Sequence, residues 1–165
     1  MSVPAPREPG RYRIELVCLG NICRSPMAHV VLETRRDEAG LGDVVEVTSS
    51  GTGDWHVGNR MDRRAAATLS AAGYDATRHR ARQYDAASAD GVDLVLAMDG
   101  DNLRDLGGVS PRVMLFRAFD PEDSGGDVPD PYYGGDAGFE EVLSMVDRTS
   151  ASLVEQVAAA LGRRP

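Results

Sequence analysis

The stretch "ELVCLGNICRSPMAHVV", Glu15 to Val31, decides the fold of this chain. It holds both cysteines of the protein, Cys18 and Cys23, between a short apolar run and an arginine-serine-proline triplet. Ser25 suits the N-cap of a helix, and Pro26 suits its first position, where the missing N–H has no partner to lose. The stretch therefore predicts a strand, a tight loop and a helix whose N-terminus faces the end of that strand.

The residues of this loop have the chemistry of an anion cradle. Backbone N–H groups before a helix N-terminus offer positive potential to a phosphate, Gly20 permits close approach, and Asn21 tolerates a positive φ. Arg24 can grip two phosphate oxygens with its planar fork. Such settings lower the pKa of a thiol from about 8.5 to roughly 3.5–7.5. We therefore expect Cys18 to be a thiolate nucleophile for phosphoryl transfer.

Composition limits the other classes of protein. The chain has 165 residues, 42% of them hydrophobic, and 18 basic against 26 acidic residues, for a net charge of −8. An acidic chain is a poor general binder of nucleic acid or of an anionic membrane surface, so we expect neither as a partner. No stretch approaches the length of a membrane span, no signal peptide is evident, and two cysteines do not form a secreted disulfide framework. We expect a cytoplasmic protein.

Hydrophobic patterning predicts alternating strands and helices. We expect strands over 11–18, 43–49, 92–98 and 112–116, and helices from Pro26, over 61–73, over 100–108 and from Ala137 onward. Long loops cover 50–59 and 120–136. Residues 1–10 are predicted to be a flexible tail and residues 11–165 a single phosphatase domain. The order predicts an α/β fold, doubly wound, with a four-stranded parallel sheet and helices on both faces. Ligands bind at the carboxyl ends of such strands, where Cys18 lies.

The segment "VCLGNICRSPMA" resembles the signature of the low-molecular-weight protein tyrosine phosphatases, of the bacterial type. The resemblance continues in the family's order through "SSGTGDWHVG", "HRARQ", "AMDGDNLRDL" and "DPYYGG", and so spans most of the chain. It implies hydrolysis of phosphotyrosine through a cysteinyl-phosphate intermediate, without a cofactor. We expect no metal either, because no His or Cys cluster has the spacing of a metal site.

The resemblance also assigns roles within the site. Cys18 is the expected nucleophile, Arg24 the phosphate clamp and Asp130 the general acid. The expected phosphate-binding loop comprises Leu19, Gly20, Asn21, Ile22, Cys23, Arg24 and Ser25. The expected loop-supporting residues are Asn21, Ser25, Ser49 and His79, with His79 acting by way of Ser25. Because Asp130 must be protonated while Cys18 is ionised, we expect a bell-shaped, mildly acidic pH profile.

Each assignment has an ordinary structural alternative. Cys18 taken alone would be a buried small hydrophobe, and His79 a surface histidine. Asp130 lies between two prolines in "VPDPYY", which also fits turn chemistry. The motif around each residue favours the catalytic interpretation of all but His79, for which both remain open.

Aromatic residues indicate the substrate. Trp55, Tyr132 and Tyr133 fall in the two long loops and would form a deep slot for a phenyl ring, too deep for phosphoserine. The alternative is that one of them packs into the core. The expected partners are tyrosine-phosphorylated proteins or peptides. A tyrosine kinase is a further candidate, since some family members are themselves phosphorylated. We expect a monomer or a weak dimer.

Three other functions compete. Protein-arginine phosphatases of the same family resemble "CTGNTCRS", with threonine where this chain has the apolar Ile22, which favours an aryl ester. Thioredoxin-coupled arsenate reductases need further cysteines, and none follows Cys23, although a version that uses an external thiol stays open. A non-catalytic phosphotyrosine-binding module is disfavoured because Cys18, Arg24 and Asp130 are all present.

The sequence also predicts structural or regulatory roles for several residues. Cys18 and Cys23 are a candidate redox pair that forms a reversible disulfide, although Cys23 also fits as a small residue beneath the loop. Asp99 and Asn102 are expected to fix a helix start, without chemistry. A solvated acidic loop is expected for Asp120, Glu122, Asp123 and Asp127. Two interpretations are open for one group of arginines, a basic face that attracts phosphopeptides or solubilising surface charge: Arg60, Arg63, Arg64, Arg78, Arg80 and Arg82.

Overall fold

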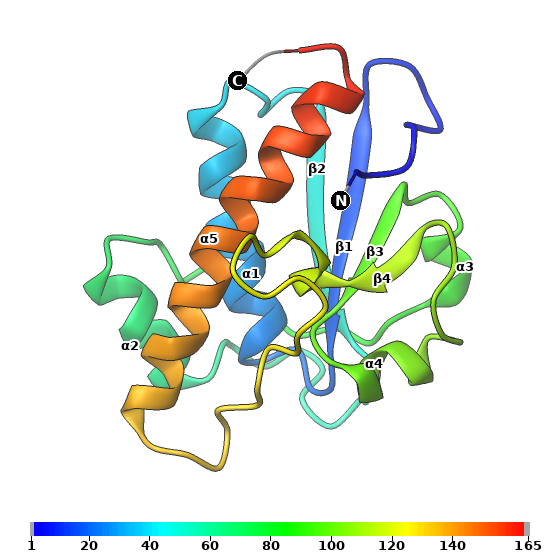
Figure 1. Cartoon of the computed structure of the whole chain (residues 1–165). Coiled ribbons are helices and arrows are strands. Elements are labelled where there is room, and N and C mark those ends of the chain that lie inside the picture. The colour runs from blue at the N-terminus through cyan, green and yellow to red at the C-terminus, as the bar shows by residue number, and fades with distance from the viewer. Residues whose placement is uncertain (1, 164–165) are drawn as a thin grey trace.

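A computed structural model describes residues 2–163 of the chain. Its centre is a parallel sheet in the order β2-β1-β3-β4. The strands are β1 (Tyr12–Cys18), β2 (Val45–Gly51), β3 (Leu94–Ala97) and β4 (Val113–Leu115). The helices are α1 (Arg24–Glu38), α2 (Arg63–Ala71), α3 (Ala86–Ala89), α4 (Gly100–Asp105), α5 (Asp136–Ala160) and the 3₁₀ helix η1 (Phe116–Phe119). The predicted α/β fold with a four-stranded parallel sheet is confirmed (Figure 1).

The central strand β1 is buried on both faces. Ile14 and Leu16 belong to the larger core, which also contains the apolar sides of α1 and α5. Val17 points the other way and packs with Ala89 of α3 and Val95 of β3. Parallel strands covered on both faces need apolar side chains in both directions, which explains the continuous run in this strand. Helices therefore cover both faces of the sheet, with α1 and α5 side by side on one of them (Figure 1).

Helix α1 begins earlier than the sequence indicates. It starts at Arg24, its N-cap is Cys23, and no side chain caps it. The prediction of Ser25 as N-cap is wrong, because the Ser25 hydroxyl lies within the helix and contacts Cys18 instead. Pro26 stands in the first turn, where its missing N–H still costs no hydrogen bond.

The N-terminal segment, expected to be a flexible tail, contacts the rest of the domain at several points. Residues 2–10 contain neither helix nor strand, but Val3 packs against the core and the Tyr12 hydroxyl donates to the Pro4 carbonyl at 2.9 Å. The Arg7 amide donates to Asp93 at 2.6 Å. These contacts attach the segment to the end of the sheet. Met1 and residues 164–165 of the predicted domain lie outside the described residues.

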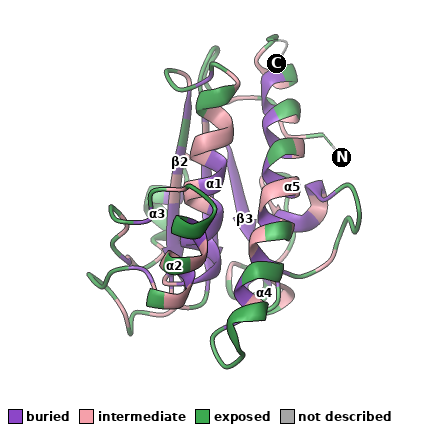
Figure 2. Ribbon diagram, turned by 90° about the vertical axis from the view of Figure 1, so that its left-hand side faces the viewer, coloured by how far each residue is buried: buried purple, intermediate pink, exposed green. Residues whose placement is uncertain are grey.

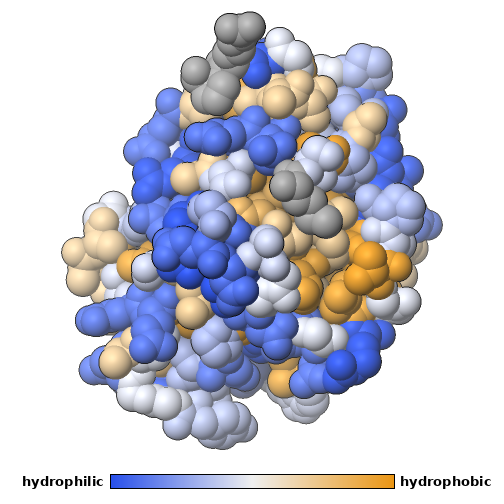
Figure 3. Space-filling model, viewed as in Figure 1, coloured by the Kyte–Doolittle hydropathy of each residue, from blue (hydrophilic) through white to orange (hydrophobic). Residues whose placement is uncertain are grey.

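The pattern of buried residues follows from a sheet that is covered on both faces. Buried residues line the strands and the inner sides of α1 and α5 (Figure 2). The face shown in Figure 3 is largely hydrophilic, with an apolar patch on the β4 side of the sheet. Within residues 2–163, no helix combines the length and apolar character needed to cross a bilayer.

Candidate active site

The loop between β1 and α1 turns at Asn21. Its φ of 57° is the only positive φ of a non-glycine residue within the described chain. In this conformation the backbone amide of Asn21 points at Cys18 and donates to its Sγ at 3.3 Å. Gly51, at the end of β2, packs closely against the loop, since a Cβ there would lie 2.8 Å from the Leu19 carbonyl oxygen. Nothing in the sequence indicated this role for Gly51; the close approach expected at Gly20 concerns the phosphate and stays a prediction.

Cys18 lies at the bottom of the loop with a hydroxyl beside its sulfur. The Sγ is buried and lies 2.9 Å from the Ser25 Oγ. The Asn21 side-chain amide donates to that same oxygen at 2.8 Å. Because this bond occupies an acceptor site of the hydroxyl, the Ser25 proton is available for an acceptor, and the sulfur at 2.9 Å is closer than the Ser50 carbonyl oxygen at 3.4 Å. Ser25 is thus placed to stabilise negative charge on Cys18.

Asn21 is the centre of the support network behind the loop. Its Nδ2 also donates to Ser49 at 3.1 Å, and its Oδ1 accepts from the Arg82 amide at 3.0 Å. Its carbonyl oxygen lies 2.7 Å from the Nε2 of His79. Burial lowers the pKa of His79, which favours the neutral ring. The structure thus brings His79 behind the loop as expected, but through Asn21 rather than through Ser25.

A second histidine extends this network and was missed from the sequence. The Nδ1 of His29 in α1 lies 3.1 Å from the Ser49 hydroxyl, and its Nε2 lies 3.3 Å from Glu33. A histidine on a partly exposed helix face carries no local signal of such a role. Only the packing of α1 against the end of β2 brings His29 to Ser49.

Arg24 is held on its inner side by two acceptors. Its buried guanidinium donates from Nη1 to Asp99 at 2.5 Å and to the Val128 carbonyl at 3.0 Å. Burial opposes the charge, but the Cys18 sulfur and the Asp99 carboxylate raise the pKa of Arg24 above its ordinary value. The guanidinium therefore stays a cation with one edge fixed and the other directed toward the pocket.

Asp99 has a larger role than the sequence indicated. It caps α4 by accepting from the Asn102 amide at 2.8 Å, which confirms the expected helix start. Its second oxygen binds Arg24, a positioning contact that the sequence did not indicate. The available signal was its position two residues after the end of β3, since the ends of neighbouring parallel strands meet at one edge of the sheet.

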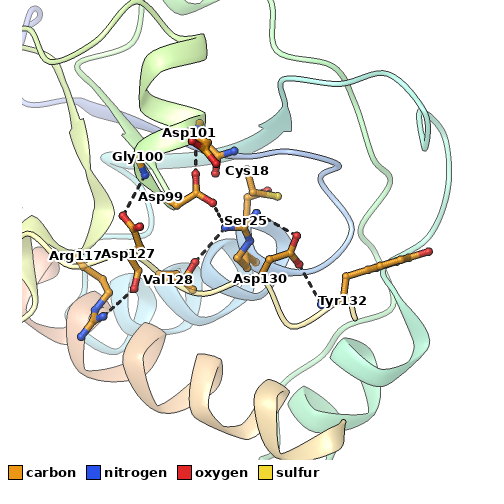
Figure 4. A network of polar contacts seen from close by, with 12 residues as sticks. Cys18, Ser25, Asp99, Gly100, Asp101, Arg117, Asp127, Val128, Asp130 and Tyr132 are labelled. Atoms are coloured by element: carbon orange, nitrogen blue, oxygen red, sulfur yellow. Dashed lines mark hydrogen bonds and ion pairs between the residues drawn. The ribbon is translucent and has the colours of Figure 1, made fainter. Parts of the chain in front are cut away.

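Asp130 faces Arg24 from the loop before α5. Its Oδ2 lies 3.6 Å from the Arg24 Nη2, and its Oδ1 accepts from the Tyr132 amide at 3.0 Å (Figure 4). One oxygen therefore makes the turn contact and the other faces Arg24, a geometry that fits both interpretations of Asp130. The loop is anchored where the Val128 amide donates to the Met98 carbonyl at 2.7 Å.

In the acidic segment before Asp130, Glu122, Asp123 and Asp127 are exposed as expected, whereas Asp120 is buried. Asp120 is 1% exposed and binds Arg117 at 2.8 Å and Arg148 at 2.9 Å. Asp127 accepts from the Gly100 amide at 3.1 Å, and its carbonyl accepts from Arg117 at 2.8 Å (Figure 4). The prediction of a solvated loop is wrong for Asp120, since two arginines compensate its buried charge.

A pocket of about 430 Å³ opens above the sulfur. It is lined by Cys18, Leu19, Gly20, Ile22, Cys23, Arg24, Trp55, His56, Asp130, Tyr132 and Tyr133. Trp55 is 67% exposed and the two tyrosines 38% and 92%, so none of the three packs into the core. All three line the pocket, and the Tyr132 and Tyr133 rings pack edge to face with their centres 5.0 Å apart. His56 was missed, although it follows Trp55 directly in the same loop.

Arg64 and Cys23 complete the surroundings of the pocket. The Arg64 guanidinium lies 5.4 Å from the ring centre of Tyr132 and supports that wall. Cys23 is a free thiol, as is Cys18, and burial raises its pKa above the ordinary value. Within residues 2–163, no three His, Cys, Asp or Glu side chains gather closely enough to hold a metal ion.

This fold and this site define the class of cysteine-dependent phosphatases. The chain belongs to the low molecular weight phosphotyrosine protein phosphatase family, whose model matches residues 13–163. It is 47% identical over 154 residues to a low molecular weight protein-tyrosine-phosphatase of Streptomyces coelicolor, covering 88% of this chain and 93% of that one.

Solved structures show the same fold. A protein tyrosine phosphatase from Entamoeba histolytica superposes with a TM-score of 0.83 at 28% identity, covering 92% of this chain and 98% of that one. The arginine phosphatase YwlE superposes with a TM-score of 0.78 at 24% identity, covering 88% and 95%. The second likeness concerns the fold alone.

Proposed function

We propose that this protein hydrolyses phosphotyrosine in proteins and peptides through a phosphate ester on the Cys18 sulfur. The observation that carries the proposal is the arrangement of three groups around one pocket. Cys18 lies at its base, Arg24 and Asp130 lie on one side, and aromatic residues form the rim. The family name and the names of the relatives agree with this activity.

In the first step, the Cys18 sulfur attacks phosphorus and the bond from phosphorus to the phenolic oxygen breaks. Asp130 gives its proton to the departing oxygen. The free edge of Arg24 and the amides of the loop bind the three equatorial oxygens, where charge builds up in the transition state. Asp99 and the Val128 carbonyl keep the guanidinium from turning away, because they hold its Nη1.

In the second step, water attacks phosphorus and the bond from sulfur to phosphorus breaks. The Asp130 carboxylate takes the proton from that water, and inorganic phosphate leaves. The Ser25 hydroxyl stabilises the departing thiolate at 2.9 Å. Because the first step needs a protonated Asp130 and an ionised Cys18, activity rises and falls around a mildly acidic optimum.

The pocket wall supports an aryl ester as substrate. Trp55 and Tyr132 offer flat faces to a phenyl ring, and Ile22 adds an apolar contact. An apolar side chain at position 22 gives no hydrogen bond to the guanidinium of a phosphoarginine. The fold likeness to an arginine phosphatase does not decide between the two substrates.

Hydrolysis of p-nitrophenyl phosphate by wild type, Cys18→Ser and Asp130→Ala tests the proposal, with phosphoarginine and arsenate as competing substrates. We expect no turnover by Cys18→Ser and a loss of roughly 10²–10⁴ in kcat for Asp130→Ala. The loss in Asp130→Ala is larger for phenyl phosphate, whose leaving group needs the proton more. Wild-type activity on phosphoarginine alone would overturn the substrate, and a fully active Asp130→Ala would overturn the acid.

The cellular setting belongs to the same proposal. Two free thiols in the site fit a reducing compartment, for which we propose the cytoplasm. Tyr133 is exposed enough to be a substrate of a tyrosine kinase, our candidate regulatory partner. We propose a monomer or a weak dimer, which light scattering at micromolar concentration would test.

A further inference from the structure

A second hollow lies against the active-site pocket. Its volume is about 270 Å³, and it is lined by Leu19, Thr52, Gly53, Trp55, Tyr84 and Asp105. Leu19 and Trp55 also line the active-site pocket. The two residues therefore separate the two cavities, and whatever occupies the second hollow lies next to a substrate bound in the first.

The dividing Trp55 is held in place by the backbone beneath it. A Cβ on Gly53 would overlap the six-membered ring of Trp55, so the ring lies directly on this glycine. The Gly53 amide donates to the Leu19 carbonyl at 2.9 Å, and the Thr52 amide donates to the Cys18 carbonyl at 2.9 Å. The hollow is thus tied to the catalytic loop and keeps a fixed position relative to the Cys18 sulfur.

The lining combines apolar surface with one negative charge. Leu19 is 41% exposed and, with the rings of Trp55 and Tyr84, offers apolar contact. Asp105, at the end of α4, is exposed at the hollow, and within residues 2–163 no ion pair engages its carboxylate. Arginine and lysine match such a lining, because their apolar stems cover apolar surface while their cationic ends reach a carboxylate or an aromatic face.

We propose that this hollow binds an arginine or lysine side chain two residues away from the phosphotyrosine of a peptide substrate. The inference rests on the proposed function. In an extended peptide, side chains two residues apart point to the same side and lie about 6.6–6.8 Å apart, whereas the adjacent side chain points away. A peptide that inserts its phosphotyrosine beside Trp55 therefore directs that residue toward the other side of the indole.

The test compares phosphotyrosine peptides that carry arginine, leucine or glutamate at position −2, −1, +1 or +2, with alanine elsewhere. For wild type we expect arginine at −2 or at +2 to raise kcat/KM about fivefold over glutamate, with leucine between them, and a smaller difference at −1 or +1, where only the net charge of the protein acts. Asp105→Asn should reduce the arginine advantage over leucine about threefold, the size of an exposed ion pair. Asp101→Asn, in the same helix but outside the hollow, should leave it unchanged.

Hydrolysis of p-nitrophenyl phosphate provides the baseline, and both variants should match wild type on it. If wild type cleaves none of the phosphotyrosine peptides, the proposed function itself fails. If it cleaves them all at equal rates, or prefers leucine to arginine, the proposed hollow is overturned while the phosphatase stands. An arginine advantage over leucine that is undiminished in Asp105→Asn would equally overturn it.

Discussion

Asn21 determines the shape of the catalytic loop through both its backbone and its side chain. Its φ is 57°, and its side chain binds Ser25, Ser49 and the Arg82 amide. Asn21→Ala loses these hydrogen bonds and also strains the backbone, whereas Asn21→Gly loses only the hydrogen bonds. We expect the alanine variant to be less stable than the glycine variant by about 1 kcal/mol in urea unfolding. Equal stabilities would show that the left-handed conformation costs nothing here.

Cys23 provides a second prediction at the level of single residues. Peroxide oxidises the Cys18 thiolate to a sulfenic acid, and attack by the Cys23 sulfur forms a disulfide and releases water. Dithiothreitol then reduces the disulfide and restores activity. We expect much poorer recovery in Cys23→Ser, because Cys18 is over-oxidised, as measured by residual turnover after peroxide and thiol treatment. Equal recovery of activity in wild type and Cys23→Ser would rule out a protective disulfide between Cys18 and Cys23.

Site residues that lie within a recognisable local motif could be predicted from the sequence. Cys18 and Arg24 lie in one loop, and Asp130 is identified by the segment around it; the structure places all three at one pocket. Asp99 and His29 were missed because their contacts join positions that are 75 and 20 residues apart in the chain. Such contacts depend on how strands and helices pack, which local patterns do not show.

At the level of elements, the segment that carries Asp130 is held by a buried ion cluster. Asp120 joins Arg117 of η1 to Arg148 of α5. Burial alone would raise the pKa of Asp120, but hydrogen bonds from Arg148, the Glu122 amide and Arg117 lower it from 3.8 to about 2. The cluster therefore stabilises the fold above about pH 4, and this contribution is lost as pH falls toward 2.

Removal of the Asp120 carboxylate should lower the stability of the folded protein. We expect Asp120→Asn to lower the free energy of unfolding at pH 7 by about 3 kcal/mol, because two arginines lose their shared partner. The stability of the variant should also fall less than that of wild type between pH 4 and pH 2. Asp123→Asn is the matched control, since Asp123 is exposed and binds Arg117 at 3.3 Å, and should cost less than about 1 kcal/mol. Equal losses in the two variants would contradict the buried cluster.

Helices and strands with a clear hydrophobic pattern were predicted well from the sequence, whereas the shortest helices were not. The apolar run of β1 and the helical stripe of α5 match the structure closely. Helix α3 has four residues and η1 has four, too few to show a period, and neither was predicted. The start of α1 was placed too late because Ser25 resembles an N-cap, while its hydroxyl contacts the Cys18 sulfur.

At the level of the whole molecule, sheet topology assembles the site. Strands β2, β1 and β3 are parallel neighbours, so their carboxyl ends meet at one edge of the sheet. Gly51, Cys18 and Asp99 stand at or within two residues of those three ends. This edge of the sheet could be predicted from the order of elements, whereas the individual contacts across it required the three-dimensional structure.

The net charge of −8 acts on substrates before they bind. Long-range repulsion should slow acidic phosphopeptides more than neutral ones, and salt shortens its range from about 30 Å at 0.01 M to about 8 Å at 0.15 M. We expect the ratio of kcat/KM for an acidic peptide to that for a neutral one to rise over this interval. Steady-state assays at both salt concentrations measure the ratio, which cancels the effect of salt on the phosphate itself. A constant or falling ratio would contradict the prediction.

The covalent intermediate tests the central claim most directly. Wild type mixed with p-nitrophenyl phosphate, quenched in acid within the first turnovers and digested with trypsin, yields the peptide of residues 14–24, which holds both cysteines. We predict phosphate on the sulfur of Cys18, located by fragmentation mass spectrometry, and none on Cys23. Rapid turnover with an unmodified Cys18, together with an active Cys18→Ser variant, would contradict the account.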